Sequence, residues 1–288
     1  MTLFGPNETP EPSPEPAAPA GPLVRVRMTL AYDGFGFKGF AAQPGQKTVA
    51  GTLSSAMAKV VGHQVTLTCA GRTDSGVHAA GQVVHADLSP ERGRLDVDAL
   101  VQSCNRMLSP RIVVREAALV DDTFDARRSA TSRQYRYRVL TSPVADPFLA
   151  NTSWHLGQSL DMRAMRMAAD ALIGEHDFSA FCRRPPDLAP GEPLVRRVID
   201  SRWEAEGEML LSFWIEATSF CHQMVRSVVG TMVEVGRGRR TAADMVAALR
   251  SRDRGRAASP APPHGLCLMA VSYDQPEPRG AEPDGAGG

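Results

Sequence analysis

The chain has 288 residues, enough for one large domain or two smaller ones, and its 43% hydrophobic and 22% charged residues are ordinary for a globular protein in water. No apolar run approaches the roughly 20 residues that cross a bilayer, and residues 1–22 lack the basic and apolar segments of a signal peptide, so we expect a cytoplasmic protein with no membrane contact. The formal net charge is zero, but residues 23–273 alone carry +6, which leaves nucleic-acid binding open.

Two tails frame the folded part. Residues 1–22 are rich in Pro, Glu and Ala, and residues 274–288 are rich in Gly, Pro and Ala. Both segments contain too few apolar side chains to offset the entropy of ordering the chain. We therefore expect disordered tails at 1–22 and 274–288.

Residues 23–125 form the first half of the folded part. Alternating apolar residues predict a strand over 23–32, and Thr48 and Asp96 are good N-caps for two helices. The expected elements are a strand at 23–32, a helix at 49–61, strands at 64–70 and 80–88, a helix from Asp96 to Met107 and a strand at 112–119. This β-α-β-β-α-β order is that of a ferredoxin-like unit.

Residues 126–273 repeat the order of elements with additions. Asp161 caps a predicted helix that carries Met162, Met165 and Leu172. The other expected elements are strands at 132–140, 195–206 and 208–217, helices at 222–235 and 241–250, and a closing strand at 266–273. The fold class is thus α+β, with two ferredoxin-like halves.

The most informative motif is the run Ala70-Gly71-Arg72-Thr73-Asp74-Ser75-Gly76-Val77-His78-Ala79. It places one carboxylate, Asp74, in a glycine-flanked loop between two predicted strands. Such a carboxylate suits nucleophilic or acid–base chemistry. By itself, the run is also ordinary turn chemistry, because Asp and Ser side chains cap turns.

Further strings decide between these interpretations. In chain order they are Tyr32-Asp33-Gly34, Gly81-Gln82-Val83-Val84-His85, Phe124-Asp125-Ala126-Arg127, Tyr135-Arg136-Tyr137, Gly174-Glu175-His176-Asp177-Phe178 and Phe220-Cys221-His222-Gln223-Met224-Val225-Arg226. Together with the Asp74 run, the chain from about Val24 to Tyr273 resembles the tRNA pseudouridine synthases of the TruA type. The resemblance implies the pseudouridine synthase fold, in which the two ferredoxin-like (RRM-like) halves share a mostly antiparallel central sheet flanked by helices.

The resemblance also implies roles for particular residues. Asp74 is the expected nucleophile, and Arg226 is its expected charged partner. Tyr135 is expected to stack on the extruded uracil, and it either also takes the C5 proton or has no role beyond stacking. We expect Arg72 and His78 to contribute to substrate binding. The reaction is redox-neutral and takes up no group, so we expect neither a cofactor nor a metal.

The implied activity is that of an intramolecular transferase. It isomerises uridine to pseudouridine in the anticodon stem-loop of tRNA, at positions 38, 39 and 40, and family members act as homodimers. Three alternatives stay open: a non-catalytic RNA-binding protein on the same scaffold, a pseudouridine synthase with another RNA target, and a hydrolase that uses Asp74 on a different substrate.

Three further features of the sequence concern its arginines, its cysteines and its departures from the family pattern. Arginine outnumbers lysine by 29 to 3, and the clustered arginines are candidate phosphate contacts: Arg127, Arg128, Arg133, Arg183, Arg184, Arg196, Arg197, Arg237, Arg239 and Arg240. The five scattered cysteines lack a Cys-x-x-Cys pair, so we expect reduced thiols. Phe40, Ala41 and Ala50 depart from the residues usual in the family.

Overall fold

The computed structural model describes residues 21–89, 95–189 and 191–274, so that the predicted tails lie almost wholly outside the described residues. The first half contains β1 (Val24–Tyr32), α1 (Val49–Val61), β2 (Thr68–Cys69), β3 (His78–Leu88), α2 (Val97–Leu108) and β4 (Ile112–Val120). The second half contains β5 (Ala130–Leu140), β6 (Trp154–His155), α3 (Met162–Asp170), β7 (Gly174–Asp177), β8 (Val195–Ala205), β9 (Leu210–Ala217), α4 (Met224–Gly236), α5 (Ala242–Ser251) and β10 (Leu266–Tyr273).

The helix starts follow from local capping. The Thr48 side chain accepts a hydrogen bond from the Gly51 N–H, and the Asp96 and Asp161 carboxylates do the same for Ala99 and Ala164. These three predicted caps are confirmed.

The predicted strand at 64–70 is wrong in length. Only Thr68 and Cys69 pair with β3, opposite His85 and Val84. Val65 is buried and Leu67 packs against the core although neither belongs to a strand. Alternating burial therefore indicated which side chains face inward, but not whether the backbone joins the ladder.

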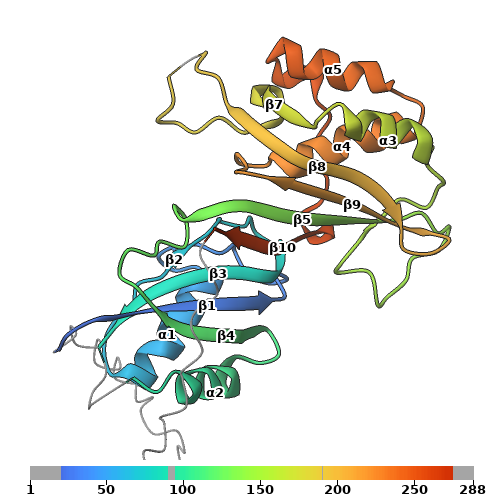
Figure 1. Cartoon of the computed structure of the whole chain (residues 1–288). Coiled ribbons are helices and arrows are strands. Elements are labelled where there is room, and N and C mark those ends of the chain that lie inside the picture. Colours follow the sequence, from blue (N-terminus) through green and yellow to red (C-terminus); the bar gives the residue numbers. More distant parts are fainter. Residues whose placement is uncertain (1–20, 90–94, 190, 275–288) are drawn as a thin grey trace, which may run out of the picture.

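A single sheet runs through both halves (Figure 1), in the order β4-β1-β3-β10-β5-β9-β8-β7. Within it the first half follows the order β4-β1-β3-β2, and the second half follows the equivalent order β10-β5-β9-β8. The halves join where the last strand, β10, pairs in parallel with β3 through two residue pairs, while the other main pairings are antiparallel. The α+β fold with a shared, mostly antiparallel sheet is confirmed, and the exact division at residues 125 and 126 stays a prediction.

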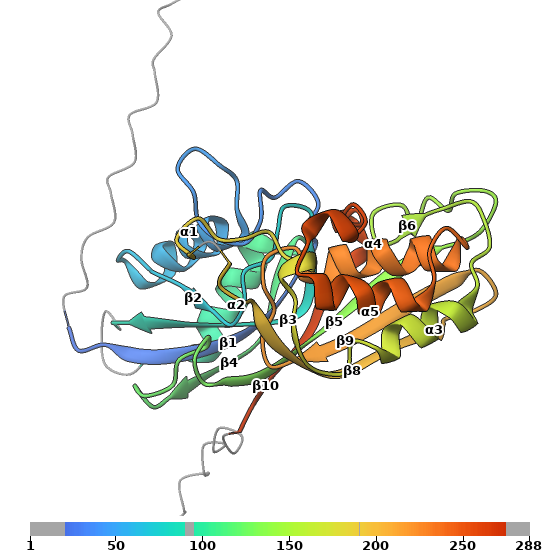
Figure 2. The same cartoon turned by 90° about the horizontal axis from the view of Figure 1, so that it is seen from above.

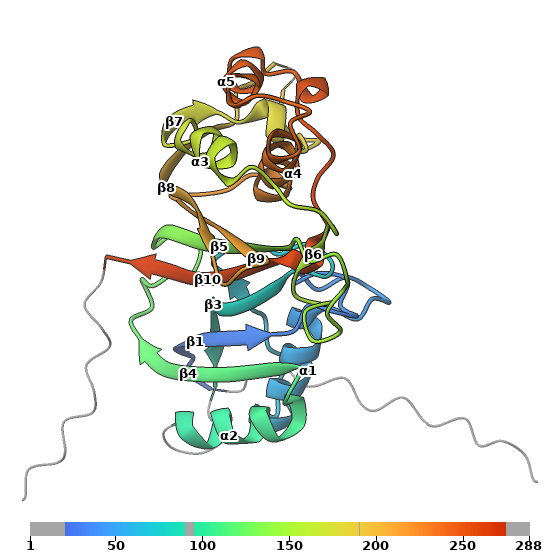
Figure 3. The same cartoon turned by 90° about the vertical axis from the view of Figure 1, so that its right-hand side faces the viewer.

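The helices lie toward the two ends of the sheet. Seen from above, α1, α4 and α5 lie on the same side of the sheet (Figure 2). From the side, α1 and α2 lie near β1 and β4, and α3, α4 and α5 lie near β7 and β8, with β3, β10 and β5 between the two groups (Figure 3). No helix within the described ranges combines the length and apolar character needed to cross a membrane.

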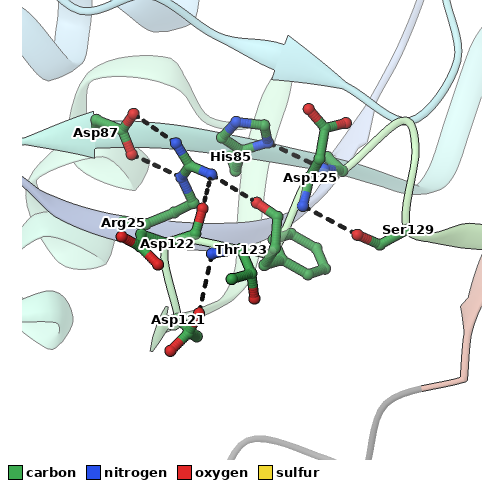
Figure 4. Close-up of polar contacts among 10 residues, drawn as sticks. Arg25, His85, Asp87, Asp121, Asp122, Thr123, Asp125 and Ser129 are labelled. Atoms are coloured by element: carbon green, nitrogen blue, oxygen red, sulfur yellow. Dashed lines mark hydrogen bonds and ion pairs between the residues drawn. The ribbon is translucent and has the colours of Figure 1, made fainter.

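A polar network fixes the segment that leads from β4 to β5 (Figure 4). Arg25 forms a two-pronged ion pair with Asp87, at 2.7 and 2.8 Å, and donates to the Phe124 carbonyl oxygen at 2.9 Å. The His85 Nδ1 atom accepts a hydrogen bond from the Ala126 N–H at 3.0 Å. The strings around His85 and Phe124 thus have a structural explanation, because they hold the crossover to the second half.

The cysteine prediction needs a correction. Cys182 and Cys221 are paired as a disulfide, with their Cα atoms 5.8 Å apart. Cys69, Cys104 and Cys267 are free thiols. The 39 residues between Cys182 and Cys221 hid the pair, since only the docking of α4 on the loop before β8 brings the two residues together.

Candidate active site

Asp74 lies in the loop that joins β2 to β3, and its side chain is 27% exposed. Two hydrogen bonds of Thr73 hold the loop in place. The Thr73 hydroxyl lies 2.8 Å from the Tyr32 hydroxyl, and the Thr73 carbonyl oxygen accepts a hydrogen bond from the Phe40 N–H at 3.0 Å. The carboxylate therefore stands on a well-anchored turn and still reaches solvent.

The first loop of the chain supports the Asp74 loop by close packing. A Cβ atom on Gly34 would lie 2.1 Å from the Val77 carbonyl oxygen, so only glycine fits at this position. Phe40, one of the departures from the family pattern, is buried with its ring 6.1 Å from that of Tyr32. This departure thus lies in the packing beneath the loop, away from the carboxylate.

Arg226 reaches the same carboxylate from the first turn of α4. Its Nη1 atom lies 3.2 Å from Asp74 Oδ2, and its Nε atom donates to the Ala261 carbonyl oxygen at 2.7 Å. With only 15% of its side chain exposed, the guanidinium is held between these two acceptors. A fixed guanidinium orients the carboxylate as well as balancing its charge.

His222 also contacts the carboxylate, and the sequence analysis gave it no role. Its Nε2 atom lies 3.3 Å from Asp74 Oδ1, and 45% of its side chain is exposed. The two carboxylate oxygens thus face two different nitrogen groups from one segment, 222–226. The string that contains Arg226 was the available signal, but nothing in it distinguished His222 from its neighbours.

Tyr135 lies on β5 and is only 7% exposed. Its ring meets that of Phe220 edge to face, with the centroids 5.0 Å apart. A methyl group on Gly71 would lie 3.8 Å from the Tyr135 hydroxyl oxygen, which places this hydroxyl beside the Asp74 loop. Burial raises the pKa of the Tyr135 phenol well above its ordinary value near 10, so the phenol is neutral at physiological pH.

The other two expected site residues differ in accessibility. Arg72 is exposed, two residues before Asp74, and its side chain has no hydrogen-bond partner among the described residues. His78 is buried: its Nδ1 atom accepts from the Gly34 N–H at 3.1 Å, and its Nε2 atom lies 2.7 Å from the Asn151 carbonyl oxygen. Both ring nitrogens of His78 are engaged by the protein, and substrate binding by His78 stays a prediction.

Several arginines from the candidate phosphate contacts have structural partners instead. Arg133 is 8% exposed and donates to the carbonyl oxygens of Ala70 and Arg127, at 2.9 and 2.7 Å. Arg237 and Arg239 both pair with Glu234. Arg133 therefore ties the start of the Asp74 loop to the second half, and its buried side chain is not available to a phosphate.

The combined geometry is that of a partly exposed carboxylate that accepts a hydrogen bond from the Arg226 guanidinium and lies 3.3 Å from the His222 ring, with the buried Tyr135 side chain beside its loop. Such a carboxylate can attack an electrophilic carbon, and the neighbouring aromatic rings add apolar surface. Within the described ranges, no three His, Cys, Asp or Glu side chains are arranged to hold a metal ion.

Comparison with known proteins identifies the family of the chain. The family model described as tRNA pseudouridine synthase matches residues 28–127 and 168–274. The chain belongs to the tRNA pseudouridine synthase family. Among the candidate site residues, Asp74 lies in the first matched range and Arg226 lies in the second, whereas Tyr135 lies between the two ranges.

Curated relatives within the tRNA pseudouridine synthase family align over most of the chain. The tRNA pseudouridine synthase A of Halalkalibacterium halodurans is 42% identical over 245 residues, which cover 85% of this chain and 90% of the relative. The protein of the same name from Bordetella petrii is 42% identical over 268 residues, covering 92% and 97%. That of Myxococcus xanthus is 39% identical over 251 residues, covering 87% and 92%.

Proposed function

We propose that this protein isomerises uridine to pseudouridine in the anticodon stem-loop of tRNA, at positions 38, 39 and 40, with Asp74 as the nucleophile. The single observation that carries the proposal is the Asp74 carboxylate held by Arg226 and His222, in a member of the tRNA pseudouridine synthase family. An RNA-binding protein without catalysis has no use for such an oriented carboxylate.

The reaction can be written with the groups of this chain. An Asp74 carboxylate oxygen attacks C1′ of the ribose, and the N1–C1′ bond breaks with its electron pair leaving on the uracil. The uracil turns, the C5 carbon forms the new bond to C1′, and the Asp74 oxygen departs. The proton lost from C5 balances the one gained at N1, so no redox partner or additional group is consumed. Arg226 keeps the carboxylate oriented through both displacements.

The aromatic rings near Asp74 have a role in substrate binding, before any bond is broken. A uridine in a stem must leave the stack to reach Asp74, at a cost of a few kcal/mol. The Tyr135 and Phe220 rings offer an apolar surface on which the extruded uracil regains part of that cost. The raised pKa of Tyr135 favours stacking over a role as the base that takes the C5 proton.

We also propose that the protein acts as a homodimer in the cytoplasm, as the family resemblance implies. Light scattering of the purified protein at several concentrations tests the dimer. A mass equal to one chain of 31.0 kDa throughout would refute it.

Release of tritium from uridine C5 tests the activity. Wild-type protein should release tritium from tRNA transcripts labelled at C5, and Asp74→Asn should release none while it still binds the transcript. Mapping of the modified positions then decides between the anticodon stem-loop and another target. Binding without release by the wild type supports the RNA-binding alternative. Neither binding nor release supports the hydrolase that acts on a different substrate.

A further inference from the structure

A second candidate site borders the segment that carries His222, since Gln223 is part of its lining. It is a hollow of about 360 Å³ whose lining includes Ser179, Arg183, Arg184, Gln223, Arg252 and Arg254. Four of these side chains are guanidinium groups, contributed by the loop that follows the short helical turn Ser179–Phe181 and by the segment after α5.

The positive charge of the hollow is mostly uncompensated. Only Arg252 has an acidic partner among the described residues, at 2.8 Å from Asp177 Oδ2. Arg184 donates instead to the neutral carbonyl oxygens of Ala189 and Glu192, both at 2.7 Å. Three positive charges thus face the hollow without a carboxylate.

Arg254 shows the effect of this imbalance. Its Nη atoms donate to the Ala180 carbonyl oxygen at 3.3 Å and to the Ser227 hydroxyl oxygen at 3.1 Å. Partial burial without a negative partner lowers its pKa from the ordinary value. Asp253, the neighbouring residue in sequence, accepts from the Gly255 N–H and does not line the hollow. An anion in the hollow would remove the cost of this unpaired charge.

The hollow is joined to the Asp74 site by the backbone. The Arg183 N–H donates to the His222 carbonyl oxygen at 2.9 Å, while the His222 ring contacts Asp74 at 3.3 Å. The preceding residues of the two segments, Cys182 and Cys221, are joined by the disulfide. Two adjacent cross-links thus hold the loop that carries Arg183 against the segment that carries His222.

We propose that this hollow binds a phosphodiester of the RNA strand that carries the target uridine, with Arg183 as the direct contact. The inference rests on the proposed function, since a nucleotide that turns out of the stack stays attached to the phosphates on both sides. Guanidinium groups match phosphate geometry with paired N–H donors. Arg183 is exposed and has no side-chain partner among the described residues, so its donors are free. Arg184 and Arg254, fixed by neutral oxygens, supply the surrounding positive field.

The test compares Arg183→Gln with Arg106→Gln, a matched substitution of an exposed arginine on α2. Both are measured in an Asp74→Asn background, by titration of a tRNA transcript at several salt concentrations. We expect Arg183→Gln to weaken binding roughly tenfold, and to lower the slope of log Kd against log salt by about 0.7 to 0.9. Arg183→Lys should keep the salt slope because it keeps the charge. In active protein, Arg183→Gln should raise KM and change kcat less than about twofold.

Equal slopes for Arg183→Gln and Arg106→Gln would overturn the proposal. Inorganic phosphate provides the second arm: if it binds the wild type but not Arg183→Gln, and leaves the affinity for the transcript unchanged at constant ionic strength, the hollow takes a free anion and the RNA assignment is wrong. Tritium release by the wild type distinguishes failure of the proposed function from failure of the phosphodiester site. Without release, but with the expected difference in slope, the proposed function fails while the phosphodiester site stands.

Discussion

Asp74 and Arg226 lie 152 residues apart in the chain, and their side chains meet at 3.2 Å. Asp74 comes from the first ferredoxin-like half and Arg226 from the second. The contact exists because β10 returns to the middle of the sheet, where it pairs with both β3 and β5. The pairing of β10 that joins the two halves therefore also brings Asp74 and Arg226 together.

Replacement of Arg226 tests how much the orientation of Asp74 matters. We expect Arg226→Gln to lower kcat by roughly 100-fold or more, because the carboxylate loses its fixed partner. The Ala261 carbonyl oxygen also loses its hydrogen bond, which costs about 1–3 kcal/mol of unfolding free energy if it stays buried. Single-turnover tritium release and urea unfolding measure the two effects. Arg106→Gln, at an exposed arginine on α2, should change neither by much.

His222 should contribute less than Arg226. Its side chain is 45% exposed, and water can replace part of its contact with Asp74. We expect His222→Phe to lower kcat about 3- to 10-fold and His222→Gln less, because the amide can still donate to the carboxylate. Single-turnover rates for both variants at pH 7.5 provide the measurement. A loss as large as that of Asp74→Asn would show that His222 has a chemical role of its own.

Tyr135→Phe distinguishes stacking from proton transfer. Because burial holds the phenol neutral, we expect the variant to keep its activity within about tenfold, whereas Tyr135→Leu loses the aromatic surface and falls further. The rate of Tyr135→Phe should follow the same dependence on pH as the wild type between pH 6 and 9. Complete inactivity with intact tRNA binding would instead assign the base role to Tyr135.

Stability should fall at alkaline pH. The pKa values of all four tyrosines, Tyr32, Tyr135, Tyr137 and Tyr273, are raised in the folded state, chiefly by burial. Above pH 10, the unfolded chain loses phenol protons that the native protein retains, so the free energy of unfolding decreases as pH rises. Urea unfolding at pH 8, 10 and 11, with tyrosinate absorbance as a second signal, measures the decrease. A constant free energy across this range would contradict the burial of these phenols.

The pair Cys182 and Cys221 predicts the number of reactive thiols. Protein purified without reductant and then unfolded should show three reactive thiols, from Cys69, Cys104 and Cys267, and five after reduction. The double variant Cys182→Ser, Cys221→Ser should show three in both states. Five thiols in the unreduced wild type would mean that the cysteines remain reduced, as cytoplasmic thiols usually do.

The sequence by itself determined the helices, most of the longer strands and, through the family resemblance, the chemical class of the site. Thr48, Asp96 and Asp161 mark helix starts because capping is a local interaction, and the alternation in β1 is visible because a strand repeats every two residues. The string around Asp74, read with the other strings, pointed to the family that the comparison confirms.

Only the tertiary structure decided which distant residues meet. The contact of His222 with Asp74, the burial of Arg133, the Cys182–Cys221 pair and the arginine hollow join segments far apart in the chain. Such contacts depend on how whole helices and strands dock, and the free energy of docking is summed over many side chains of the core. No short run of residues contains that sum, so the contact of His222 with Asp74, unlike that of Arg226, became visible only in the folded chain.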